Sequence, residues 1–436
     1  MNPSLFLSFV LSFFPKLQTL IEKINGSKKE LTYLHKDTSI LRRVYAPDNK
    51  YEADTVDVSY MAADYVSMDS SLPIKSRDVI ARATGKLPKV GMKKALKESE
   101  ITALNVMEAQ GGQIAEIRRK LAQDSVACST GIDERNEYAF LSGLSQGYVA
   151  LKDDDSENLL RINYMYPDKN KCGVETVGTL TVDDLKRAID TADQNGDSII
   201  QFWIAKTTFD ALKKTDSAKQ LVASYNGQTY DSASILPVPT TAKFQEAFED
   251  ETGVTFRVIN RSIRIEKDGK YTSVKPWNSN YVIGVCSEQI GALVYGQLAE
   301  QTNPAEGVQY QLIDSYKLIS KYSKTDPLLE VTCGQAFVLP VIEDVDSIYQ
   351  IDLTLEDTVA SDSDDETDDT VTINGTAYTK ATAIDVLNRF GAGLKSTASD
   401  EEVIAAYNAL SATNKKKFAT AMSSDSEETT EETTEG

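Results

Sequence analysis

The sequence predicts an α+β fold, and three observations carry this prediction. Residues 99–151 have the composition of a long helix. Residues 181–224 run from a helix through a buried apolar strand to a second helix, as in an α/β unit. Residues 309–339 are rich in β-branched and aromatic residues, which favour long strands. The 436 residues accommodate about two to three domains and a sizeable core, and no internal repeat is visible.

Residues 1–26 predict an amphipathic helix. Apolar residues recur at three- and four-residue spacing from Leu5 to Ile24, and Asn25-Gly26 would end the helix. Such a helix needs a partner surface. Leu5–Phe14 also resembles the apolar core of a signal peptide, although no positive charge precedes it and no small-residue cleavage site follows. Ten residues are too few to span a bilayer.

Residues 27–63 predict an arm that becomes strand-like from Tyr51, and residues 64–98 predict an extended segment with turns at Pro73, Gly85, Pro88 and Gly91. Residues 75–97 of this segment are strongly basic. They could be a solvated loop, touch nucleic acid or bind an acidic patch on another subunit, but they contain none of the aromatic residues typical of nucleic-acid sites. Within 75–97 Asp78 is the one acidic residue, and the basic residues are Lys75, Arg77, Arg82, Lys86, Lys89, Lys93, Lys94 and Lys97.

The rest of the body predicts alternating helices and strands. The long helix would begin at Ser99 and break at Gly111-Gly112 and near Thr130-Gly131. Thr181 would cap a helix that reaches Asn195. The other expected elements are a helix over 207–224 and strands over 159–166, 198–205, 254–265, 281–286, 309–322 and 328–339, the last two joined by a turn at 325–327.

The net charge of −20 is unevenly spread, because two short tracts hold 14 acidic residues and no basic residue. Residues 355–370 predict an acidic linker and residues 423–436 a disordered acidic tail. Between them, residues 371–422 predict a small α+β module with a hairpin turn at Asn374-Gly375. The module could be a surface-displayed adhesion or decoration element, or a packing partner of neighbouring subunits; Lys415–Lys417 are weak support for nucleic-acid binding.

The sequence offers no coherent catalytic, metal or cofactor site, so we expect neither an enzyme nor a cofactor. Its four cysteines form no CxxC pair, and its single histidine is His35. Gly143–Gly147 matches the GxSxG nucleophile elbow around Ser145, but no histidine follows it. We therefore expect this motif to be the C-terminal end of a helix.

Several stretches, taken in order, resemble the major capsid protein of tailed phages, in the lambda-like family with the Hong Kong 97-type capsid fold. They follow the family order of arm, extended loop, long helix, α/β domain and returning strands, and the likeness covers residues 27–353. They are Tyr51–Val58, Asp133–Phe140, Leu159–Pro167, Ile290–Gly296, Lys324–Pro327 and Gly334–Val341.

The resemblance implies a division of the chain. Residues 1–26 would be a scaffold-like helix that acts internally or binds a scaffolding protein, 27–63 the N-arm and 64–98 the extended loop. Residues 99–180 would be a peripheral domain with a spine helix, 181–308 an axial domain and 309–354 return strands of the peripheral domain. The basic loop residues would meet acidic surface on an adjacent copy, such as Asp153–Asp155 or Glu249–Glu251, and Arg42 and Arg43 would make N-arm contacts.

The implied function is that of a non-enzymatic major head protein. Its copies would form the hexamers and pentamers of an icosahedral shell around double-stranded DNA, in a virion assembled in the bacterial cytoplasm. Scaffolding, portal and decoration proteins are further expected partners, whereas DNA would be near only non-specifically and no membrane is involved. The alternatives are an encapsulin-type nanocompartment shell, a secreted or surface binding protein, and a hydrolase using Ser145, which the histidine count nearly eliminates.

Overall fold

The computed structural model describes residues 2–19, 33–56, 80–110, 114–151, 160–227, 236–267 and 270–357, and, towards the C-terminus, 370–373, 376–389, 400–411, 414–415 and 417–418. The chain divides into two compact units, Met1–Thr358 and Val359–Gly436. The boundary falls inside the acidic tract expected to be a linker. Each unit has its own hydrophobic core.

The first sheet of unit 1 is built around one long strand, β16. Its C-terminal half pairs with β13, and its N-terminal half lies between β15 and β4. All these pairings are antiparallel, whereas the outer strand β1 runs parallel to β13. The strands are β1 (Leu41–Tyr45), β4 (Lys89–Lys97), β13 (Gly291–Gly296), β14 (Gln309–Ile313), β15 (Lys317–Thr325) and β16 (Leu328–Ile342), and β14 pairs with β15.

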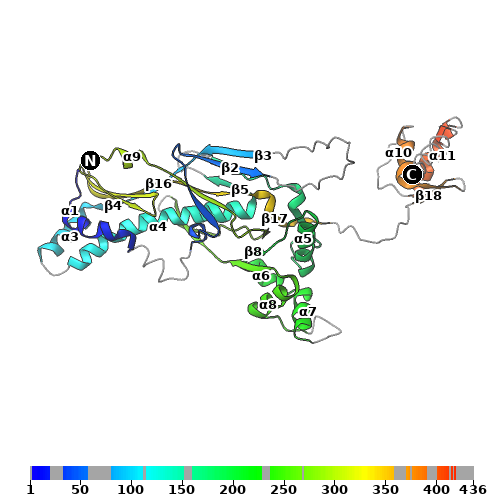
Figure 1. Ribbon diagram of the computed structural model, residues 1–436, viewed down its shortest axis with the longest axis horizontal. Coiled ribbons are helices and arrows are strands. Elements are labelled where there is room, and N and C mark those ends of the chain that lie inside the picture. The colour runs from blue at the N-terminus through cyan, green and yellow to red at the C-terminus, as the bar shows by residue number, and fades with distance from the viewer. Residues whose placement is uncertain are drawn as a thin grey trace, which may run out of the picture. The chain divides into compact units, whose positions relative to one another are not determined.

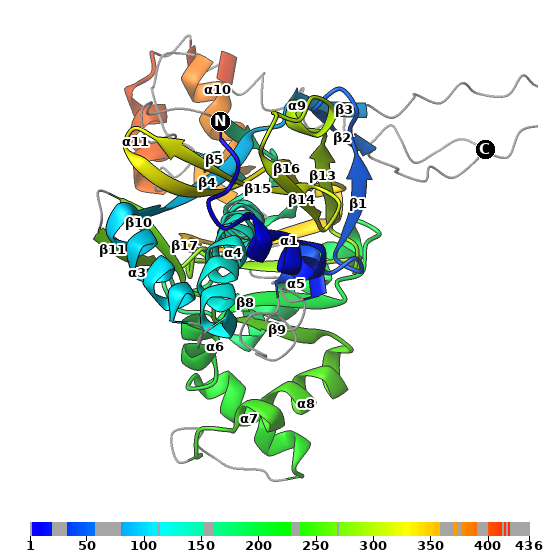
Figure 2. The same ribbon diagram turned by 90° about the vertical axis from the view of Figure 1, so that its left-hand side faces the viewer.

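The helix α4 (Ile114–Gln146) runs beside this sheet (Figure 1) and buries one face against it. A glycine permits the close approach: a Cβ atom added at Gly334 of β16 would lie 2.8 Å from Cys128 Cβ of α4. The shorter helix α3 (Glu98–Ala109) precedes α4, and the N-terminal helix α1 (Leu7–Phe13) lies beside α4 (Figure 2). α4 is therefore the spine on which the first sheet and the N-terminus are packed.

The second sheet has the order β7-β17-β12-β8-β9, and a separate core fills the space between it and its helices. Thr181 and Asp184 form a capping box at the start of its first helix, as the sequence predicts. The strands are β7 (Lys171–Val174), β8 (Gln201–Ala205), β9 (Thr255–Ile259), β12 (Tyr281–Val285) and β17 (Ile348–Glu356). The helices are α5 (Val182–Gln194), α6 (Lys206–Leu212), α7 (Asp216–Tyr225) and α8 (Thr241–Thr252).

The described part of unit 1 also contains two-stranded sheets and a short helix. The hairpins are β2 (Lys50–Val56) with β3 (Ile80–Lys86), β5 (Tyr148–Leu151) with β6 (Leu160–Asn163), and β10 (Ile263–Lys267) with β11 (Lys270–Val274); the helix is α9 (Ala299–Thr302). In unit 2, β18 (Thr370–Ile373) pairs with β19 (Thr376–Thr379), and α10 (Lys380–Arg389) and α11 (Asp400–Ala409) follow. Its small core includes Leu387, Val403 and Phe418.

Some predicted helix boundaries are wrong for identifiable reasons. α4 continues through Thr130-Gly131 without a break, because the helix packs closely against the sheet at this point. The predicted helix over 207–224 is divided by a turn, after which Thr215 caps α7. The N-terminal α-helix ends at Phe13 and continues as a 3₁₀ turn containing Pro15, which cannot donate a helical hydrogen bond. The expected end at Asn25-Gly26 lies outside the described residues.

Two predicted strands are also divided. The segment 309–322 becomes β14 and β15, which are joined at Asp314 and Ser315, both with positive φ. The segment 254–265 becomes β9 and the start of β10. The structure further differs from a single extended segment over 64–98: the hairpin begins at Lys50, and residues 89–97 form the sheet strand β4. The reason is the apolar alternation of Val90, Met92 and Leu96, which the lysines between them obscure in the sequence.

Candidate assembly surfaces

The predicted basic residues fall into three groups. Lys75 and Arg77 lie outside the described residues. Arg82 is on β3, in register with Asp54 of β2, and its side chain is likewise outside the description. The remaining five, Lys86 on β3 and Lys89, Lys93, Lys94 and Lys97 on β4, are all exposed. The structure therefore gathers five of the eight predicted contact residues along the end of one hairpin and the strand that follows it.

The strand β4 is held to the body by its apolar side chains. Met92 and Leu96 pack against the core shared by α1, α3 and α4, while Val90 packs against the main core. One backbone edge of β4 pairs with β16, and no described residue pairs with the other edge. An exposed strand edge that carries lysines discourages indiscriminate pairing between sheets. The lysines are thus fixed on a rigid strand.

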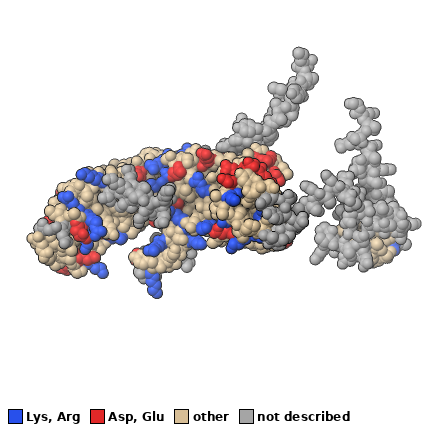
Figure 3. Space-filling model, turned by 90° about the horizontal axis from the view of Figure 1, so that it is seen from below, with Lys and Arg blue, Asp and Glu red and all other residues tan. Residues whose placement is uncertain are grey.

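None of these five lysines forms an ion pair with a described residue. On the face shown in Figure 3, basic and acidic side chains are otherwise interspersed over the described surface. Neighbouring positive side chains repel one another, and an acidic surface lying against them offsets this repulsion. This makes the β4 lysines a candidate contact surface.

The two arginines expected to make N-arm contacts lie on β1. Both are exposed, but Arg42 already has a partner in its own chain. Its Nε and Nη2 atoms donate to the Glu343 carboxylate at 2.9–3.0 Å, a bidentate geometry that fixes the guanidinium. Arg43 is the freer of the two to face another molecule.

The N-arm is attached to the spine helix by a buried set of charges that the sequence did not reveal. His35 Nδ1 lies 2.6 Å from Glu137 Oε2, and the backbone N–H groups of Leu34 and His35 both donate to the Glu137 carboxylate at 3.1 Å. The His35 and Glu137 side chains are fully buried. One carboxylate of α4 thus holds the 3₁₀ turn Leu34–Lys36 in place.

Lys317 of β15 belongs to the same set of buried charges. Its Nζ donates to both Asp133 oxygens at 2.8 Å and lies 2.6 Å from Asp314 Oδ2. Lys36 Nζ also donates to Asp314 Oδ2, at 2.8 Å. Gln18, which follows α1, exchanges two 3.0 Å hydrogen bonds with Asp314. The N-terminus, N-arm, spine helix and β14–β15 turn therefore meet at one point.

The carboxyl groups of this set are held ionised despite their burial. Burial alone would raise the pKa of Asp133, but the Lys317 ammonium and the adjacent His35 ring hold that pKa below its usual range. The pKa of Glu137 is likewise lowered, because its hydrogen bonds with His35 outweigh burial. Lys317 and Lys36 do the same for Asp314. The set is thus an ionic contact rather than a network of neutral acids.

The N-terminal residues supply an apolar contact as well. Phe6, Val10, Phe13 and Leu17 are buried against Ile117 and Leu121 of α4 and their neighbours. Backbone hydrogen bonds between Asn2 and Ser323, at 3.0 and 3.2 Å, attach the chain start to β15. Residues 2–19 thus find a partner surface within their own chain.

Ser145 has a structural environment. It is fully buried in the last turn of α4, where its Oγ donates to the Ser142 carbonyl at 3.3 Å and accepts from the Asn278 N–H at 3.2 Å. Gly147, with φ of +71°, follows the helix and lets the chain turn into β5. The GxSxG match is therefore a helix C-terminus, as predicted.

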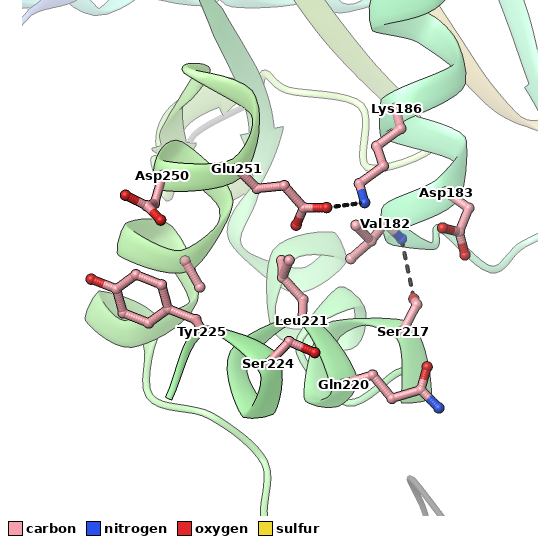
Figure 4. Close-up of a pocket in the computed structure, with 11 residues that line it drawn as sticks. Val182, Asp183, Lys186, Ser217, Gln220, Leu221, Ser224, Tyr225, Asp250 and Glu251 are labelled. Atoms are coloured by element: carbon pink, nitrogen blue, oxygen red, sulfur yellow. Dashed lines mark hydrogen bonds and ion pairs between the residues drawn. The ribbon is translucent and has the colours of Figure 1, made fainter. Parts of the chain in front are cut away.

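A groove of about 420 Å³ opens between α5, α7 and α8 (Figure 4). Its floor includes Leu221, and across it Lys186 pairs with Glu251. Ser217, also on its wall, accepts a hydrogen bond from the Val182 N–H at 3.2 Å and so supports the start of α5. These groups serve local structure, and they do not form an acid, base and nucleophile set.

Among the described residues, no cluster of three or more histidine, cysteine, aspartate or glutamate side chains could hold a metal ion. No described helix has both the length and the apolar character needed to cross a membrane. The features that stand out in unit 1 are thus its contact surfaces and the buried N-arm attachment.

Known proteins resemble this chain over most of unit 1. The family described as phage major capsid protein E matches residues 17–353. No curated protein matches. A prophage capsid protein from Escherichia coli CFT073 is 14% identical, with a TM-score of 0.46 over 78% of this chain and 98% of that one. The capsid of cyanophage A-1(L) is 12% identical, with a TM-score of 0.40 over 76% and 99%.

An encapsulin complex from Synechococcus elongatus PCC 7942 is also similar, at 10% identity and a TM-score of 0.33 over 76% of this chain and 95% of that one. These structural likenesses are distant, so the family match identifies the chain. That match runs from the end of the N-terminal helix through the spine helix and both main sheets. The chain belongs to the phage major capsid protein E family and is a structural capsid protein.

Proposed function

We propose that this protein is the major head subunit of a phage, and that its copies form the pentamers and hexamers of an icosahedral shell around double-stranded DNA. The family match over residues 17–353 is the observation that supports this, because it includes nearly all of unit 1. Assembly would take place in the bacterial cytoplasm before the protein becomes part of the virion. Electron microscopy of the purified full-length protein tests the proposal, since shells should appear as closed particles.

The contact that we assign to assembly is electrostatic. The exposed lysines of β3 and β4 would meet acidic surface on an adjacent copy, and Glu249–Glu251 at the end of α8 are exposed. Asp153–Asp155, the other acidic candidate, lie outside the described residues. Complementary charges across an interface set the register and the choice of partner more than the raw affinity. Arg43 would add an N-arm contact.

Replacing Lys86, Lys89, Lys93 and Lys94 together by glutamine is expected to abolish shell assembly while leaving the subunit folded. All four side chains are exposed and form no ion pair with a described residue, so their loss should cost little folding free energy. Electron microscopy would count the particles, and circular dichroism with thermal unfolding would report the fold.

The matched control replaces four other exposed lysines, Lys169, Lys214, Lys243 and Lys270, by glutamine. This control makes the same change in net charge and should assemble normally. Normal particles from the β3–β4 variant would overturn the contact assignment. Particles that lack DNA and enclose a protein cargo would instead favour a nanocompartment shell.

Unit 2 is proposed to be an accessory element, either displayed on the surface or packed against neighbouring copies. Scaffolding, portal and decoration proteins are proposed as further partners. Unit 2 has a core of its own, and unit 1 completes both of its sheets without it. A chain ending at Thr358 should therefore fold and still form shells. Asp357 is retained in it because it accepts a 2.8 Å hydrogen bond from the Gly173 N–H.

Thermal unfolding and electron microscopy of this truncated chain check the expectation. A chain ending at Ile348 provides the contrast, because it loses β17 from inside the second sheet and should not fold. A stable subunit ending at Thr358 that fails to form shells would show that unit 2 takes part in assembly.

A further inference from the structure

The buried charges that attach the N-arm contain the only histidine of the protein. We call this set the His35 cluster; it consists of His35, Lys36, Asp133, Glu137, Asp314 and Lys317. Four of its side chains, those of His35, Asp133, Glu137 and Lys317, are fully buried. Charges in such a place must balance, because an uncompensated buried charge costs several kcal/mol.

The balance depends on the protonation of His35. The three carboxylates of the cluster face two lysines, so the cluster is neutral only when His35 carries a positive charge. The geometry agrees: Nδ1 lies 2.6 Å from Glu137, and Nε2 lies 3.7 Å from Asp133 Oδ1 and has no hydrogen-bond partner. On a neutral ring whose Nδ1 holds the proton, the Nε2 lone pair would face the Asp133 carboxylate.

The groups around the cluster do not supply the missing charge. Arg261, which precedes β10, is paired with Glu134 at 2.9 Å and lies over the Tyr33 ring at 4.5 Å. Burial raises the pKa of both Tyr33 and Tyr316, so these phenols stay neutral. The titratable and charged groups that face the cluster from the elements packed on it are Tyr33, Arg43, Glu134, Arg261 and Tyr316.

We propose that His35 is a pH-sensitive clasp, whose charged form holds the N-arm on the spine helix and whose deprotonation at alkaline pH loosens the arm. The arm in question runs from Tyr33 through β1. Its apolar and β-sheet contacts remain after deprotonation, so the arm opens more often but the subunit does not unfold. If the arm contacts neighbouring copies in the shell, particles should also weaken at alkaline pH; that last step rests on the proposed function.

The direction of the effect follows from linkage. Burial opposes the charged ring, but the Asp133 and Glu137 carboxylates beside the ring outweigh burial and raise the pKa of His35 above 6.5. A raised pKa means that the stabilisation is complete below the pKa of the unfolded chain and is lost as the pH rises through the pKa of the folded protein. The carboxylates have lowered pKa values, so their contribution is lost only in acid. The clasp is therefore strongest between these limits.

The single histidine makes the test direct. Magnetic resonance of the full chain, labelled with ¹³C in histidine, follows one imidazole, in solution for subunits or in sedimented particles for shells. Hydrogen–deuterium exchange with mass spectrometry then compares residues 33–45 at pH 6.5 and pH 9.5, after correction for the intrinsic pH dependence of exchange. We expect His35 to titrate above 6.5 and exchange of the arm to rise about tenfold for each unit of pKa elevation.

His35→Gln provides the control, because glutamine keeps a donor but cannot become charged. This variant should show fast exchange of residues 33–45 at both pH values. Titration of His35 at or below 6.5, or wild-type exchange that does not change between the two pH values, would overturn the proposal without any variant. The same would follow if His35→Gln kept the full pH-dependent change, and none of these outcomes depends on whether shells form.

Discussion

Replacement of Asp133 by asparagine is expected to lower the free energy of unfolding of unit 1 by about 3–5 kcal/mol, the range for breaking one partner out of a buried ion pair. Asp133 is the residue on which the buried charges converge. Two 2.8 Å hydrogen bonds from Lys317 end on it, and His35 and Lys36 each lie 3.7 Å away. Asparagine keeps the shape of the side chain but removes the charge that these cations require.

Asp216→Asn is the matched control, since Asp216 pairs with Lys219 at 2.9 Å on the surface, with 64% of its side chain exposed. Exposed pairs contribute about 0–1 kcal/mol, so this variant should be nearly neutral. Urea unfolding of both variants at pH 7 makes the comparison. Equal losses of unfolding free energy in the two variants would show that the buried ion pair stabilises the subunit no more than the exposed one does.

Replacement of Val10 by aspartate is expected to destabilise the subunit by more than about 3 kcal/mol or to prevent its folding. The Val10 side chain of α1 is fully buried in the apolar core that α1 shares with α4, and placing a carboxylate among these apolar side chains is costly. Thermal unfolding, or the soluble yield if the variant does not fold, is the measurement.

The adjacent Leu11 of α1 supplies the control, because 55% of it is exposed. Leu11→Asp should leave the thermal midpoint nearly unchanged. If both variants are as stable as the wild type, the N-terminal helix is not part of the subunit core. That outcome would favour the scaffold or signal-peptide interpretation. A large loss for Val10 alone would show that residues 2–19 are a structural part of the subunit.

Local sequence patterns predicted most elements correctly but not always their ends. Thr181 with Asp184, and the turn before Pro327, follow from short-range rules of capping and turn chemistry. The division of 309–322 at Asp314 does not, because Asp314 adopts positive φ where its carboxylate is held by Lys36 and Gln18, both distant in the sequence. Long-range contacts of this kind leave no local signal.

The candidate surfaces were predicted only in part. The run of lysines was evident, but the sheet position of β4 depends on pairing with β16, which lies over 230 residues away. His35 could be recognised as the sole histidine, and Asp133 and Glu137 as acids one helical turn apart. The sequence does not indicate that His35 contacts this face of α4, because His35 and Glu137 lie about 100 residues apart and meet only through tertiary packing.

The division of the chain into two units has a consequence for binding strength. Each subunit carries one copy of unit 2 with its own core, so a shell contains as many copies of this module as it has subunits. Modules linked to one particle bind a repetitive target with an avidity that can exceed the single-site affinity by about 10²–10⁴. A module with weak affinity for a ligand on a surface could therefore hold a whole particle there, while each single contact stays readily reversible.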